Sequence, residues 1–210
     1  MEVAEPNFDS AIFIKFQKNK EINMKIKDVI KTAATLLGRT DVTAYLDSKE
    51  IEDGSETLQT VNVMTSLTNL VITELSSTFI PLKKTQTMSA YDGRIYYKDF
   101  NETLTRVTGV YSATGKSVDY GYHPEYITLP FNSVYTVEYE YVPSNLGLED
   151  DACYAEKDVP PLVLAYGLAA EFCITEGSFE QAVMWHKRYV DGVEKACPPK
   201  SLTTRERRWE

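Results

Sequence analysis

The residues best suited to chemistry are two histidines, three cysteines and a Gly-Lys-Ser triplet. The triplet, Gly115-Lys116-Ser117, resembles the end of a phosphate-binding loop, but that motif needs another glycine five positions earlier, where this chain has Val110. The residues that follow are strand-like and offer no helix N-terminus to a phosphate. We therefore interpret the triplet as a hairpin turn.

The histidines and cysteines form no recognisable catalytic or metal-binding pattern. A nucleophilic pair of Cys173 and His186 would need an orienting group and an oxyanion site, and the spacing specifies neither. His123 stands alone before a proline. Cys153, Cys173 and Cys197 have no C-x-x-C spacing, so they predict neither a zinc site nor a disulfide framework. We expect no catalytic, metal-binding or cofactor-binding residue, and predict that the protein is not an enzyme.

Carboxylates and tyrosines alternate along residues 135–142. This period of two predicts a strand with an aromatic face, made by Tyr135, Val137, Tyr139 and Tyr141, and a mostly polar face. We expect Glu138 and Glu140 on the solvent side. The tyrosines either pack the core of a small sheet, which is their commoner use, or form a stacking face for a sugar or a base.

Charge and composition restrict the class of partner. The net charge of −9 disfavours a protein that binds nucleic acid along its length, because that affinity comes chiefly from Lys and Arg. Glu2, Glu5 and Asp9 stand where a secretory signal carries positive charge. No apolar run approaches the ~20 residues of a membrane-spanning helix. We expect a soluble protein of a reducing compartment with no membrane partner.

Helical spacing predicts three helices in residues 24–78. The first carries Val29 and Ile30 and ends at Gly38, and a short second helix is capped by Thr40 or Asp41. The third is expected over 55–76, because no glycine or proline interrupts that stretch. From residue 79 to about 145, tyrosine, threonine, valine and turn residues predict an antiparallel β-module, with a tight hairpin at Tyr91-Asp-Gly-Arg94. Its expected strands span 94–100, 104–111, 118–122, 126–129 and 135–142.

Residues 146–197 predict an acidic loop around 148–152 and then a pair of helices. Pro160 and Pro161 suit the first turn of a helix, and Gly177 suits the left-handed residue that ends it. Ser178 and Gln181 predict a capping box for the second helix. The first helix has a face rich in small residues, formed by Leu164, Ala165, Leu168, Ala169, Phe172 and Cys173.

These elements predict an α+β fold in which N- and C-terminal helices form one helical bundle, with the small antiparallel β-module inserted between them. We favour insertion because neither helical half alone can bury its apolar stripes. The small-residue face should then pack against the helices of residues 25–76. Residues 1–23 are either a segment without a role in the fold or an arm with a short strand at Ala11–Phe16. Residues 198–210 form an extended C-terminal tail.

The layout resembles one family. The features that carry the resemblance are Leu36-Leu37-Gly38, a long third helix, Tyr-Val-Pro143, Val159-Pro-Pro and a paired-helix end with Gly177 and Trp185. Through them, about residues 24–197 of the chain resemble the head-to-tail adaptor, or neck, proteins of tailed bacteriophages. The resemblance implies a structural virion protein, assembled in the host cytoplasm, that forms a ring, commonly a dodecamer, between the portal protein and a tail or nozzle protein. Genome DNA would pass through the ring without specific binding, which an acidic lining favours.

The tail carries the residues expected to reach the portal, which are Arg205, Arg207, Arg208 and Trp209. Arginine and tryptophan are enriched at the centres of interfaces. A solvated end without a partner is the other interpretation. The alternative function for the whole chain is a tyrosine-rich module that binds a carbohydrate or a host surface.

Deleting residues 198–210 tests the tail. If the tail docks on the portal, the shortened chain should lose affinity for purified portal protein, because the arginine and tryptophan contacts are gone. Binding is measured by biolayer interferometry with the full chain as reference. An unchanged affinity would contradict the docking role.

Overall fold

The computed structural model describes residues 23–48, 56–155 and 158–197. The strand expected at Ala11–Phe16 and the four expected portal contacts in the tail lie outside these ranges. The described chain combines α-helices with small antiparallel sheets, which confirms the mixed composition expected from the sequence. Within it, no helix combines the length and the apolar composition that crossing a membrane requires.

The N-terminal helices agree with the sequence pattern. They are α1 (Ile26–Leu37), α2 (Thr40–Ser48) and α3 (Glu56–Glu74), and α3 continues into a π-helical segment, η2 (Leu75–Phe79). Gly38 ends α1 with a φ of 72°, a conformation that costs glycine little. The threonine hydroxyls of α3 find partners within the helix, as when that of Thr68 donates to the carbonyl of Met64, one turn earlier, at 2.7 Å.

The C-terminal helices are α4 (Pro161–Thr175) and α5 (Phe179–Ala196). Gly177 lies between them with a φ of 74°, as expected. The predicted capping box is wrong, since the side chain of Ser178 makes no capping hydrogen bond. The backbone N–H of Ser178, which a capping box would pair with Gln181, instead donates to the carbonyl of Cys173 at 2.8 Å.

Helix α4 is buried on almost every side. It contacts α1, α3 and α5, and Gly167, Ala169 and Ala170 are among its buried residues. A Cβ added at Gly167 would lie 2.8 Å from the side chain of Val71 on α3 and 3.1 Å from the ring of Tyr189 on α5. The predicted small-residue face is divided between two clusters. Leu164, Ala165, Leu168 and Phe172 share a core with residues of α1 and α3, whereas Ala169 and Cys173 pack with Ala182 and Trp185 of α5.

A two-stranded sheet joins the ends of the helical region. Strand β1 (Asn23–Lys25) pairs antiparallel with β8 (Asp151–Ala155). The sequence pattern predicts a loop at 148–152 and neither strand, because such short strands exist only through their pairing. Met24, Ala152 and Tyr154 bury their side chains in the same core as residues of α1, α3, α4 and α5.

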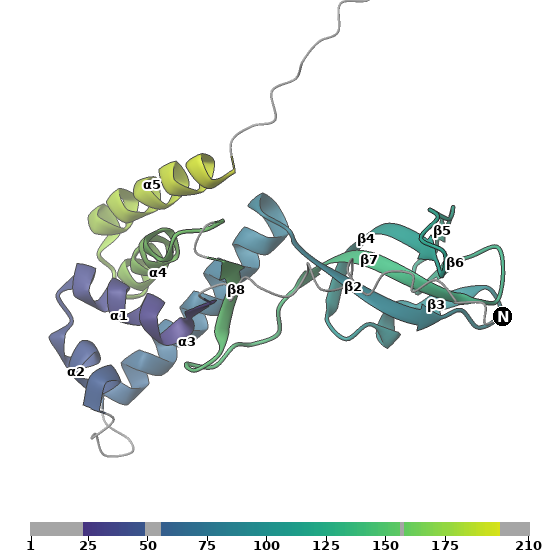
Figure 1. The fold of residues 1–210 in the computed structure, drawn as a ribbon. Helices are drawn as coiled ribbons and strands as arrows, with labels where there is room; N and C mark the ends of the chain where they lie inside the picture. Colours follow the sequence, from purple (N-terminus) through teal and green to yellow (C-terminus); the bar gives the residue numbers. More distant parts are fainter. Residues whose placement is uncertain (1–22, 49–55, 156–157, 198–210) are drawn as a thin grey trace, which may run out of the picture.

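The β-module extends away from the helices (Figure 1). Its strands are β2 (Leu82–Ser89), β3 (Arg94–Tyr96), β4 (Thr103–Ser112), β5 (Gly121–Tyr122), β6 (Tyr126–Thr128) and β7 (Val134–Val142). They form two antiparallel sheets, ordered β2-β7-β4 and β3-β6-β5, and the module has its own apolar core. The hairpin at Tyr91–Arg94 is confirmed. Strand β2 was missed, and the strand expected over 94–100 ends at Tyr96, where a 3₁₀ turn, η3 (Tyr97–Asp99), begins.

Replacing Ala169 with phenylalanine tests the packing of α4. Ala169 is fully buried in a cluster with Ala182 and Trp185 of α5, so the larger ring should overpack this contact and destabilise the protein by roughly 1–3 kcal/mol. Ile174→Phe is the matched control, because Ile174 lies on the same helix and is 47% exposed. Chemical denaturation should show the loss only for Ala169→Phe. Equal stability of the two variants would contradict the packing described here.

Candidate interaction surface of the β-module

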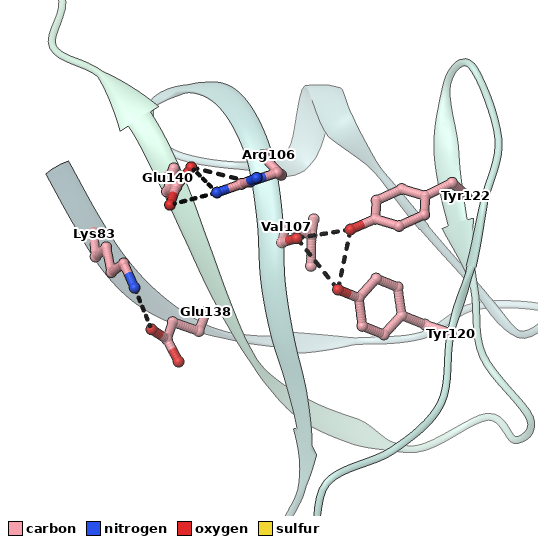
Figure 2. Close-up of polar contacts among 7 residues, drawn as sticks. All are labelled: Lys83, Arg106, Val107, Tyr120, Tyr122, Glu138 and Glu140. Carbon is pink, nitrogen blue, oxygen red and sulfur yellow. Dashed lines mark hydrogen bonds and ion pairs between the residues drawn. The ribbon is translucent and has the colours of Figure 1, made fainter. Parts of the chain in front are cut away.

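The sheet β2-β7-β4 presents two contrasting faces. Tyr135, Val137 and Tyr139 of β7 are buried in the core of the module, as their alternation predicts. Glu138 and Glu140 lie on the other face, where each is flanked by β2 and β4 (Figure 2). This outer face is the surface on which charged side chains of the three strands meet.

Glu140 is held by a bidentate ion pair. The Nε and Nη2 atoms of Arg106 donate to its two carboxylate oxygens at 3.1 and 3.0 Å (Figure 2). The side chain of Glu140 is only 9% exposed, against 64% for Arg106. The expectation that Glu140 faces solvent is therefore wrong, because strands on both sides and the guanidinium group cover it. The hydrogen bond and charge of Glu140 raise the pKa of Arg106. Glu138 has a looser ion pair, with Lys83 at 3.9 Å.

Irregular register in β4 creates this ion pair. The pairing of β4 with β7 shifts between Leu104 and Arg106 and again between Val107 and Gly109. Each shift is a β-bulge, which adds one residue to one strand and re-aims the side chains after it. As a result Arg106, and not Thr105, stands opposite Glu140. No local pattern in the sequence specifies this offset, so the ion pair could not be predicted from the sequence.

Two tyrosine hydroxyls donate hydrogen bonds to the backbone at the outer edge of β4. The carbonyl of Val107 accepts hydrogen bonds from Tyr122 at 2.7 Å and from Tyr120 at 3.2 Å (Figure 2). The two rings meet edge to face with centroids 5.2 Å apart. Loss of solvent and the hydrogen bond with Tyr122 raise the pKa of Tyr120 to about 12. Farther along the edge, the N–H of Val118 donates to the carbonyl of Val110 at 2.9 Å.

The Gly-Lys-Ser triplet belongs to the same edge and is a turn, as predicted. The N–H of Ser112 donates to the carbonyl of Lys116 at 2.9 Å, and Gly115 has a φ of 75°. The chain from this turn to Tyr122 therefore runs along β4 and covers its free backbone groups. The outer edge of β4 is paired or capped at Ser112, Val110 and Val107.

A second polar and aromatic cluster lies on the small sheet β3-β6-β5. The ring of Tyr126 stacks on His123 with centroids 4.6 Å apart and meets Tyr96 edge to face at 5.6 Å. The guanidinium carbon of Arg94 is 5.0 Å from the centroid of Tyr126. A surface cavity of about 420 Å³ adjoins this cluster and is lined by Tyr96, Tyr97, Lys98, Pro124 and Glu125. Tyrosines of the module therefore lie both in its core and on its surface.

The remaining candidate residues lie apart from these surfaces. Cys173 is buried beside Ala169 and Trp185, and its sulfur lies 4.0 Å from Oε1 of Gln181. His186 is exposed on α5. In the part of the chain that the structure describes, no cluster of three or more His, Cys, Asp or Glu side chains is arranged to hold a metal ion. The structure does not place the expected portal contacts, since residues 198–210 are outside its described ranges.

No protein-family model and no curated protein sequence matches the chain.

Removing the tyrosine hydroxyls tests the closed edge. Tyr120→Phe and Tyr122→Phe should each cost about 0.5–1.5 kcal/mol or less, because the other hydroxyl still donates to Val107. The double variant leaves that part-buried carbonyl without either donor, so it should lose more stability than the two single losses together. Urea denaturation measures all three. Tyr91→Phe, at a tyrosine that is 83% exposed, is the control, and strictly additive losses would contradict a shared acceptor.

Proposed function

We propose that the protein is a structural virion component, a head-to-tail adaptor of a tailed bacteriophage that forms a ring between the portal protein and a tail or nozzle protein. The observation that carries the proposal is the layout. Helices on both sides of the β-module share one core, and the module has a core of its own and projects from them (Figure 1). This layout agrees with the family that the sequence resembles.

The finer architecture belongs to the same proposal. A helical bundle of residues 24–78 and 146–197 would carry residues 79–145 as an inserted module. Two contacts at the entry and exit of the module support this division. The side chain of Asn69 on α3 bonds both backbone groups of Leu146, at 2.8 and 2.9 Å. The hydroxyl of Tyr154 on β8 donates to the carbonyl of Ile80 at 2.9 Å. Both hold the ends of the insertion against the helices.

Exposed apolar side chains support a role in an assembly. Tyr91 and Phe131 are 83% and 73% exposed at neighbouring turns of the β-module, which are joined by a hydrogen bond from Gly93 to Asn132. Phe179 and Val183, one turn apart on α5, are 66% and 71% exposed. Figure 1 shows these regions at opposite ends of the described chain. Exposed apolar side chains that lie together on a surface can contact partners, and two separate sets would suit the unlike contacts of a ring.

In this proposal the partners are further copies of the chain, commonly twelve in the family resembled, together with the portal and a tail or nozzle protein. Genome DNA would pass through the lumen. The net charge of −9 is suitable for such a channel, because it repels phosphates.

The second candidate is a module that binds a carbohydrate or a host surface. The surface cluster of Tyr96, His123 and Tyr126 favours it, because aromatic rings beside Arg94 and a cavity can stack on a sugar ring. The cluster already stacks on itself, which leaves fewer free ring faces for a ligand. We therefore place the adaptor first.

Negative-stain electron microscopy with and without purified portal protein separates the two candidates. An adaptor should form rings of about a dozen subunits, at least when portal is present, because each copy offers unlike patches to its neighbours. A binding module should remain small in both samples and bind defined sugars on a glycan array. Small particles with portal present, together with glycan binding, would overturn the adaptor proposal.

A further inference from the structure

The two edges of the sheet β2-β7-β4 differ. The β4 edge is covered by residues 116–122, whereas no described strand pairs with the outer edge of β2. Ala90 donates to the carbonyl of Ser133, and the register from Leu82 to Ser89 is unbroken. Bonding alternates along an antiparallel ladder, so four residues direct their backbone N–H and C=O groups away from β7. These are the exposed residues Lys83, Thr85, Thr87 and Ser89.

An open edge of this kind attracts another strand. Natural proteins protect such edges with proline, bulges, charges or a covering segment. Strand β2 contains no proline or bulge, and only Lys83 among its four outward residues is charged. The opposite edge of the same sheet has two bulges and a cover. The contrast indicates that a strand belongs on β2.

Residues 11–16, Ala-Ile-Phe-Ile-Lys-Phe, have the right composition for that strand. Their alternation separates an all-apolar set, Ile12, Ile14 and Phe16, from a set that contains Lys15. One side of β2 is exposed and carries Lys83, Thr85, Thr87 and Ser89. The other side is half-buried: Leu82 and Met88 pack against the two cores at its ends, while Lys84 and Gln86 between them bond Glu102 and Asp99. The all-apolar set would lie on this half-buried side of the sheet.

The connection to β1 gives the direction of pairing. Asn23 at the start of β1 stands opposite Ala155 of β8, and the neighbouring Tyr154 bonds Ile80, two residues before β2. The linker of residues 17–22 can span up to roughly 20 Å, enough for residue 16 to reach the beginning of β2. Residues 15 to 11 would then lie progressively closer to Ser89. A strand placed in this way would be antiparallel to β2, and every described ladder is antiparallel.

We propose that residues 11–16 of the same chain add to the free edge of β2 as an antiparallel strand, giving a four-stranded sheet. The N-terminal extension is then part of the β-module. This inference does not depend on the adaptor role, because it concerns one chain alone.

Hydrogen exchange at single-residue resolution tests the proposal. In the full chain, at least two of the amides of Lys83, Thr85, Thr87 and Ser89 should exchange about 10-fold or more slowly than in a chain lacking residues 1–16. The amides of Gln86 and Met88, bonded to β7, should exchange alike in both and report that the module is folded. Equal rates at the four outward amides would overturn the proposal.

Two single substitutions provide a matched pair. Ile14→Asp places a charge on the apolar side and should remove the protection of the outward amides, whereas Lys15→Asp on the other side should preserve it. Loss of protection in both or in neither would contradict the assigned faces. Protection that disappears when the full chain is diluted would show that the strand comes from a second copy, and would overturn pairing within one chain.

Discussion

The close packing of α4 is the contact on which the rest of the structure depends. Glycine at 167 lets the side chain of Val71 and the ring of Tyr189 approach the backbone of α4 from two sides, and a Cβ at Gly192 would lie 2.8 Å from Val163. Dense interiors tolerate little added volume. This sandwich brings together helices that are separated by the whole β-module in sequence. The entry and exit of the module are then held side by side.

In the β-module, the backbone groups at the edges of a small sheet have no neighbouring strand to bond. Along β4 these groups are protected by a pair of bulges, a turn at Gly115 and two tyrosine hydroxyls that donate to one carbonyl. The same bulges align Arg106 with Glu140, so the protection of the edge and the burial of a carboxylate share one cause. A buried carboxylate is tolerated because the bidentate pair replaces its lost hydration. The outer edge of β2 lacks these devices and is suited to accept another strand.

The division into a helical part and a projecting module is compatible with the proposed adaptor role. A subunit that must contact neighbours and two different partners benefits from separate surfaces on a rigid frame. The turns of the β-module expose Tyr91 and Phe131, and α5 exposes Phe179 and Val183, while the acidic charge of the chain suits a DNA channel. The proposed N-terminal strand would stiffen the module and complete its sheet.

Sequence alone determined the features that depend on a few neighbouring residues. Gly38 and Gly177 end helices because the left-handed conformation needs no distant partner, and the Tyr91–Arg94 hairpin likewise follows from Asp-Gly. Tertiary structure decided the rest. Strands β1, β2 and β8 exist through pairing with distant segments, and Glu140 is buried because a bulge more than thirty residues away supplies Arg106. The Ser178–Gln181 capping box fails because the turn before it had already used the Ser178 amide. Local patterns specify backbone conformation, but burial and pairing depend on which distant segments meet.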